Sequence, residues 1–289
     1  MADKKISDLT ELISANPIND TAPIVDISAN ETKKIALANL PIPESAIYHS
    51  YPYTVDFDGG TAQTRNLTSL NDSQFSSSVD SVYVGNNVTS IGASTFKDNS
   101  NLTSATISDS VASIGSKAFS YCTGLTSLAI GSRMATIGSQ SFEYCTSLTS
   151  VAIPENAGIG NFAFMGCGSL TNISFGDNVT EIGSAAFYNC SSLSGITLPE
   201  GLTSIKNGTF SYCSGLTTIT IPSGVTSIGK EAFQDCTNLS TINLLSTTPP
   251  QVGEAAFLNV SSNAKIHVPS VSSFSAILSF GGLEVIKDL

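Results

Sequence analysis

The chain has 289 residues and a net charge of −11, and only 12% of its residues are charged. This acidic balance argues against nucleic acid and anionic membranes as partners, because phosphates are held by basic patches. No apolar run approaches the ~18 residues needed to cross a bilayer, so membrane insertion is not expected either.

The first 78 residues carry no repeat. The segments PIVDIS and TKKIAL alternate apolar with other residues on either side of the short stretch ANE, which predicts a β-hairpin. Residues 41–60 are rich in proline and aromatic residues, and we expect a linker followed by a strand there. The N-terminus lacks the apolar centre of a secretion signal, so export by the usual route is not expected.

The opening segment KKISDLTELISANPINDTAPIVDISANETKKIALANL resembles the first segment of many bacteriophage tail-fibre and virion-attached proteins. The resemblance implies that residues 1–78 attach the chain to a particle, with other virion proteins as partners. It also implies a homo-oligomer, with a trimer favoured. The alternative is that this segment is an ordinary N-terminal cap of the following domain.

From about residue 79 the chain repeats a pattern of about 23 residues. A phenylalanine recurs every 22 to 24 residues, in what we call the phenylalanine column: Phe96, Phe119, Phe142, Phe164, Phe187, Phe210, Phe233 and Phe257. Each phenylalanine is preceded by an isoleucine or valine, and glycine follows that residue in most copies. Each phenylalanine except the last is followed by a leucine. Units of this length with an L-x-x-L-x-L core are typical of leucine-rich repeats, which must stack to bury their apolar faces. The pattern predicts a mainly β solenoid of about eight rungs over residues 79–265.

Six cysteines lie three residues after a phenylalanine of the column, namely Cys122, Cys145, Cys167, Cys190, Cys213 and Cys236. Stacked rungs would hold neighbouring Cβ atoms roughly 4.8 Å apart, whereas a disulfide needs about 3.8 Å. Zinc needs four ligands that converge on a point rather than lie along a line. We therefore predict a structural ladder of buried, reduced thiols that contact backbone carbonyls, without a metal or cofactor.

The pattern C-x-x-L-x-x-[LVI]-x-I-P-x-x-V-x-x-I-G-x-x-A-F resembles the BspA-like leucine-rich repeats, also called the Treponema type. This resemblance implies a surface adhesin or binding module that contacts proteins or glycans, and not an enzyme. It carries over no ligand residues. Residues 266–289 are similar to the closing segment of such arrays, which implies a last strand through Ile266 and Val268 and a short cap helix near 271–279.

Four tyrosines mark the candidate receptor contact. Tyr121, Tyr144 and Tyr212 lie two residues after a phenylalanine of the column, and Tyr188 lies one residue after. They should form a broken stripe along one edge of the solenoid, where tyrosine offers amphipathic contact area to sugars and proteins. The alternative is that tyrosine is a common residue at this position without a binding role. The outward strand positions are small and uncharged, suited to contact with another protomer or to solvent.

Catalytic chemistry has little support in the sequence. His49 and His267 are far apart, and neither has a cysteine or carboxylate at the spacing of a metal site or a catalytic triad. The segment Asp56–Gly60 lacks the further acidic ligands of a calcium loop, so we interpret it as a turn. No catalytic, cofactor-binding or metal-binding residue is predicted.

These observations lead to a non-enzymatic phage virion protein as the leading hypothesis, as a tail or head fibre or receptor-binding protein. Residues 1–78 would attach it to the particle, residues 79–265 would recognise a host-surface protein or glycan, and residues 266–289 would cap the array. The alternative hypothesis is an adhesin on the bacterial cell surface.

Overall fold

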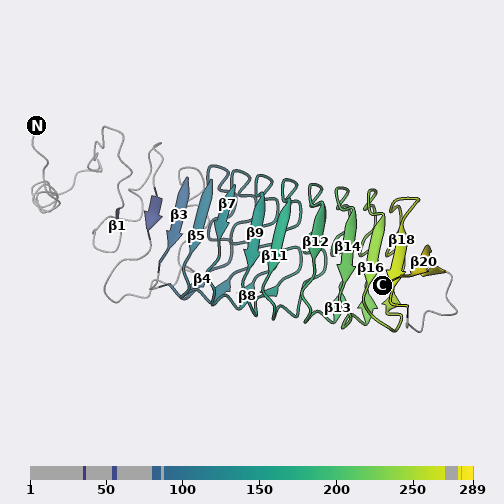
Figure 1. The fold of residues 1–289 in the computed structure, drawn as a ribbon. Coiled ribbons are helices and arrows are strands. Elements are labelled where there is room, and N and C mark those ends of the chain that lie inside the picture. Colours follow the sequence, from purple (N-terminus) through teal and green to yellow (C-terminus); the bar gives the residue numbers. More distant parts are fainter. Residues whose placement is uncertain are drawn as a thin grey trace, which may run out of the picture.

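The computed structural model describes residues 35–36, 54–56, 80–85, 88–270, 279–280 and 282–288. Within these ranges the chain is a β-solenoid of about eight rungs and contains no helix. Each rung is one coil of about 23 residues, and the rungs stack along a single axis (Figure 1). The mainly β repeat architecture predicted from the sequence is confirmed.

Each rung contributes one long strand to what we call the front sheet. These strands are β3 Ser81–Val84, β5 Ser104–Ile107, β7 Ser127–Ala129, β9 Ser150–Ile153, β11 Asn172–Phe175, β12 Gly195–Thr197, β14 Thr218–Ile221, β16 Thr241–Leu244, β18 Lys265–Val268 and β20 Leu283–Lys287. They pair in parallel and in register within three groups, β3 to β7, β9 with β11, and β12 to β20. In the third group, for example, Ile219 lies beside Ile242 and Thr218 beside Thr241. The alternation follows from the strand period of two, because inward residues such as Ile219 are buried and outward ones such as Thr218 are exposed.

A second row of two-residue strands lies on the opposite side of the coil. It contains β4 Ser90–Ile91, β6 Ser113–Ile114, β8 Thr136–Ile137, β10 Gly158–Ile159, β13 Ser204–Ile205, β15 Ser227–Ile228 and β17 Gln251–Val252. From each of these strands an irregular segment leads through the phenylalanine and cysteine columns, and we call this segment the arc. The arcs bond to one another through backbone groups, as when the Phe96 N–H donates to the Ala118 carbonyl at 2.7 Å.

The phenylalanine column forms the centre of the core. Its eight side chains are buried, and neighbouring rings stack with centroids 4.9 to 5.7 Å apart. Burying each ring should stabilise the stack by about 1.5–3 kcal/mol relative to exposure. Because each ring of the column stacks on the rings of the neighbouring rungs, the core is a column along the axis rather than a central cluster.

The second row of strands is interrupted where a lysine replaces glycine. A glycine lies four residues before the phenylalanine in every other rung, and an added Cβ at Gly183 would lie 2.4 Å from the Gly160 carbonyl carbon. Lys206 occupies this position in the rung of Phe210. The N–H groups of Gly183 and Gly229 donate to the preceding rung, but among the described residues that of Lys206 makes no such bond. The row of short strands breaks at this rung, and the Phe187–Phe210 centroid distance of 5.7 Å is the longest in the column.

The two ends of the array differ from the sequence-based expectation. The predicted cap helix at 271–279 lies outside the described residues except for Ser279, which begins strand β19 (Ser279–Phe280). β19 pairs antiparallel with β20, and β20 pairs in parallel with β18. β18 is therefore not the last strand, because the alternation of Leu283, Glu284 and Val285 extends the sheet by another strand.

At the N-terminal end, the expected hairpin falls largely outside the described residues. Of its two segments only β1 (Ile35–Ala36) is described, and it pairs in parallel with β2 (Thr54–Asp56). β2 in turn pairs in parallel with β3. These pairings extend the front sheet toward the N-terminus, and the predicted hairpin stays untested because PIVDIS lies outside the described residues.

Candidate functional site

The backbone of each arc turns the candidate tyrosines outward. Two residues in each arc adopt a positive φ, one located two residues before the phenylalanine and one two residues after it. Tyr121, Tyr144 and Tyr212 occupy the second of these positions, with φ of 61°, 55° and 61°. This left-handed conformation is unfavourable for tyrosine, and the stack holds it through rung-to-rung bonds such as Tyr121 N–H to the Glu143 carbonyl at 2.7 Å.

The four tyrosines form two pairs rather than a continuous stripe. Tyr121 and Tyr144 stack with centroids 4.9 Å apart, and Tyr188 and Tyr212 lie 5.1 Å apart at a tilt of 49°. Gly166 lies between the pairs, and a Cβ added there would be 2.5 Å from Cδ1 of Tyr144. The Tyr144 ring therefore lies over Gly166, at the rung where the stripe has no tyrosine.

Stacking determines what the tyrosines present to a ligand. The rings of Tyr121 and Tyr144 cover each other's faces, so this pair presents mainly ring edges and hydroxyl groups. Partial burial and then the Glu143 carboxylate raise the pKa of Tyr121. The Asp235 carboxylate, which is also a hydrogen-bond partner, raises the pKa of Tyr212. Both hydroxyls therefore keep their protons at neutral pH and can donate hydrogen bonds.

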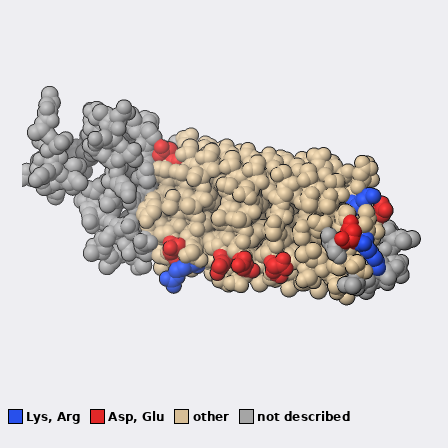
Figure 2. Space-filling model, in the orientation of Figure 1, with Lys and Arg blue, Asp and Glu red and all other residues tan. Residues whose placement is uncertain are grey.

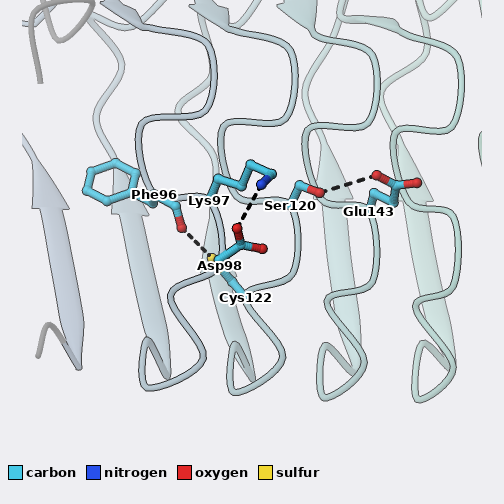
Figure 3. Close-up of polar contacts among 6 residues, drawn as sticks. All are labelled: Phe96, Lys97, Asp98, Ser120, Cys122 and Glu143. Carbon is cyan, nitrogen blue, oxygen red and sulfur yellow. Dashed lines mark hydrogen bonds and ion pairs between the residues drawn. The ribbon is translucent and has the colours of Figure 1, made fainter. Parts of the chain in front are cut away.

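Charged side chains accompany each pair of tyrosines. Asp98 forms an ion pair with Lys97 at 2.7 Å, and the Glu143 carboxylate accepts a hydrogen bond from the Ser120 hydroxyl at 3.2 Å (Figure 3). Asp235 accepts a hydrogen bond from Asn259 at 2.8 Å. These groups could not be singled out in the sequence, because charged residues on a repeat surface usually face solvent and have no distinct spacing.

The six cysteines all lie in the core with free thiols. Each Sγ lies 3.0 to 3.3 Å from the carbonyl oxygen of the phenylalanine in the preceding rung, as Cys122 does with Phe96 (Figure 3). Burial raises the pKa of Cys122, Cys167 and Cys236 to about 12. Thiols at this pKa carry almost no thiolate at neutral pH, so the ladder is chemically inert in the folded chain.

We expect the folded protein to resist thiol reagents. At pH 8 the native chain should show almost no reaction with 5,5′-dithiobis(2-nitrobenzoate) over hours, while guanidinium should expose all six thiols within minutes. The absorbance of released thionitrobenzoate measures both rates. Rapid reaction of even one thiol in the native protein would show that a rung opens locally, and mass spectrometry would identify which one.

Of the two histidines considered in the sequence, only His267 is among the described residues. The Nδ1 atom of His267 lies 2.8 Å from both carboxylate oxygens of Asp288, a partner that the sequence analysis missed because β20 was not predicted. His49 and the segment 57–60 lie outside the described residues. In the described part of the chain, no three potential metal ligands lie together, and no helix is long and apolar enough to span a membrane.

The front sheet offers a different surface from the arcs. Its outward residues, such as Ser127, Ala152 and Thr197, are exposed and small. Most of the face seen in Figure 2 is uncharged, with a few charged side chains, mostly acidic, along its lower edge and a group of both signs near the C-terminal end. Apart from Tyr83 on β3, the described outward positions of this face lack the tyrosine, tryptophan and arginine side chains that supply most binding energy at protein interfaces. The arcs, with Tyr121 and Tyr212 each more than 40% exposed, are the better candidate.

Comparison with known proteins agrees with this architecture. A leucine-rich repeat protein of T. pallidum is 26% identical to the chain, with a TM-score of 0.52 over 55% of this chain and 78% of that one. One from Bacteroides ovatus is also 26% identical, with a TM-score of 0.51 over 73% of this chain and 61% of that one. No match was found among proteins with curated descriptions. The family model described as BspA type leucine rich repeat region (6 copies) matches residues 68–159 and 157–279, and the chain belongs to this family.

Proposed function

We propose that the protein is a non-enzymatic recognition module whose solenoid binds a protein or glycan through the arcs. The observation that carries this proposal is the placement of the tyrosines. Four of them emerge on one edge of the solenoid, two in exposed positions that require an unfavourable backbone conformation. Tyrosine provides contact area with a polar end, and it is enriched where proteins bind partners.

A bacterial cell surface is the location that this proposal favours. Proteins built from BspA-type repeats are often cell-surface proteins, and this chain belongs to that family. Stacked phenylalanines and free thiols bonded to backbone carbonyls fill its described core. Such a scaffold can present a long edge to a ligand without depending on a cofactor.

A phage virion protein is the second candidate. It is supported by the resemblance of the first 40 residues to virion-attachment segments, most of which lie outside the described residues. This candidate expects a trimer of the full chain, whereas an adhesin is expected to be a monomer. Light scattering of residues 1–289 measures the mass directly, and a monomeric mass would remove self-assembly as support for a fibre.

The tyrosine edge can be tested with substitutions suited to its backbone. Tyr121→Asn and Tyr212→Asn together should reduce binding of the fluorescently labelled chain to intact cells or to a glycan array by at least about tenfold. Asparagine tolerates the left-handed conformation, and Asn189 already occupies the same position with φ of 57°. Flow cytometry or array fluorescence measures the loss.

A matched control places changes on the front sheet. Ala129→Lys and Ala152→Lys add two charges at exposed outward positions of β7 and β9 and should leave binding unchanged. If the lysine variant loses binding and the asparagine variant keeps it, the front sheet is the binding surface and the proposal is wrong.

A further inference from the structure

Glu143 is a buried carboxylate that the solenoid only partly satisfies. The residue is 8% exposed, and both of its side-chain hydrogen bonds, from Ser120 and Gln140, go to the same oxygen, Oε2. Oε1 accepts no bond within the described part of the chain, yet it is not sealed from solvent. Figure 3 shows it pointing away from Ser120. A carboxylate can accept about four hydrogen bonds, so this oxygen has spare capacity at the surface.

The second tyrosine pair provides a contrast. Beside Tyr212, the carboxylate of Asp235 has both oxygens occupied, since Asn259 donates to Oδ1 at 2.8 Å and Gln234 donates to Oδ2 at 3.0 Å. Asp235 is also less buried than Glu143. The two acids occupy comparable places beside the tyrosines, and of the two only Glu143 keeps an oxygen without a partner in the described residues.

Glu143 also lacks a counter-ion in the described residues. The ammonium group of Lys97, on the N-terminal side, forms its ion pair with Asp98 (Figure 3). Lys117 lies beside Gln140 one rung away, but it makes no ion pair with Glu143. Burying a carboxylate without a positive partner is costly, and the chain as a whole carries a net charge of −11. An external cation would relieve this cost.

The surroundings of Glu143 suit a cation on an apolar stem. Met165 holds the equivalent position in the next rung, roughly 4.8 Å further along the axis, and its thioether has no proton to donate. Phe162 is 40% exposed, and its carbonyl accepts the N–H of Met165. The Tyr144 ring leans over Gly166 on the same rung as Met165. These apolar groups can pack along the methylene groups of a long side chain whose charged end reaches Glu143.

We infer that Glu143, with Tyr144, Phe162 and Met165, forms a receptor site for a single lysine or arginine side chain of a partner protein. The inference rests on the proposed function and specifies the partner as a protein with an exposed basic residue. Oε1 of Glu143 supplies the charge and the hydrogen-bond acceptor, and Phe162 and Met165 contact the stem. The Tyr121 and Tyr144 hydroxyls remain available as donors to neighbouring groups of the partner.

The test uses the full ¹⁵N-labelled chain and two small probes, Nα-acetyl-lysine methylamide and Nα-acetyl-arginine methylamide. Titration should shift the backbone amide signals of Tyr121, Glu143 and Met165 in a saturable way. Glu143→Gln should weaken the apparent affinity at least tenfold, because the amide keeps the shape and the acceptor for Ser120 but loses the charge. Asp235→Asn is the matched control and should leave the titration unchanged, and added salt should weaken it.

Three outcomes would overturn the inference. The first is that the probes produce no saturable shift of the amide signals. The second is that Glu143→Gln binds the probes as tightly as the parent chain. The third is that only amide signals near other acids, such as Glu155, shift. A further measurement addresses Lys117: if Lys117→Met and Glu143→Gln, without probe, change the same backbone amide signals in the same direction, Lys117 is the counter-ion, the site is not free and the inference is wrong. Failure of the probes with tyrosine-dependent cell binding intact would reject the cation site alone. Probe binding without tyrosine-dependent cell binding would instead reject the tyrosine edge.

Discussion

Phe187→Ala should lower the free energy of unfolding by about 3–5 kcal/mol, the usual cost of removing a buried phenylalanine ring. Phe187 is fully buried in the middle of the column, where it stacks between Phe164 at 5.5 Å and Phe210 at 5.7 Å. Phe175 contacts it edge to face at 6.1 Å. Neighbouring rungs cannot collapse into the space, because their backbone hydrogen bonds fix the distance between coils. Equilibrium unfolding in urea, followed by circular dichroism, measures the loss.

The position of Phe187 adds a second expected effect. Each rung contacts only its neighbours, so a defect in the centre should uncouple the two halves of the solenoid. The urea transition should then broaden or separate into two steps, with a lower apparent m-value. Phe175→Ala, which removes a half-buried ring at the end of β11, serves as control and should cost less. A loss below about 1 kcal/mol for Phe187→Ala would contradict the buried column.

The repeat made most of the solenoid predictable from the sequence. A fixed interval between phenylalanines determines which residues lie above one another. A position that is buried in one rung is therefore expected to be buried in the other rungs. The C-terminal end was less predictable, because a cap is not a repeat and the segment LEVIK is as compatible with a helix end as with β20. The break at Lys206 could have been found in the sequence, since it is the one residue in the glycine column that carries a side chain. The effect of a side chain there depends on how close the coils lie, since an added Cβ at the other glycines of this position would be 2.4–2.6 Å from backbone atoms of the preceding rung. The sequence does not show this distance.

The candidate site was predictable only in part. Spacing alone placed Tyr121, Tyr144 and Tyr212 in one column, and the structure locates them on one edge. Their division into two pairs depends on Gly166, whose missing side chain allows the Tyr144 ring to lie over it. Glu143 was not singled out, because its burial depends on Ser120 in the neighbouring rung and on the curvature of the arc. Lys97, Met165 and Tyr188 occupy the same position in other rungs, one residue after the phenylalanine, and are less buried than Glu143. The different residue type at Glu143 would have been a useful signal.

Gly138→Ala should be among the most damaging changes of a single methyl group in the solenoid, costing about 3 kcal/mol, at the upper end of the range for overpacked sites. Its Cβ would lie 2.6 Å from the Ile114 carbonyl oxygen and 2.7 Å from the Gly115 carbonyl carbon. Both are backbone atoms of the preceding rung and cannot rotate away. The same Ile114 oxygen accepts the Gly138 N–H at 2.9 Å, so separating the coils would also weaken that bond. Thermal and urea unfolding of the variant measure the cost.

Gly195→Ala is the matched control, because a Cβ there meets nothing within 4 Å on the front sheet. In an exposed strand this substitution should be neutral or should stabilise the fold by about 0.4–1 kcal/mol, since alanine restricts the unfolded chain more than glycine does. Equal losses for the two variants would mean that glycine is needed for general flexibility rather than for close approach. The rung of Lys206 indicates why Gly138→Ala should cost more. Where this position carries a side chain, the row of short strands is interrupted and the spacing between phenylalanine rings is wider. Gly138→Ala should therefore open a similar gap between the rungs of Phe119 and Phe142, which the loss of amide exchange protection at Gly138 would report.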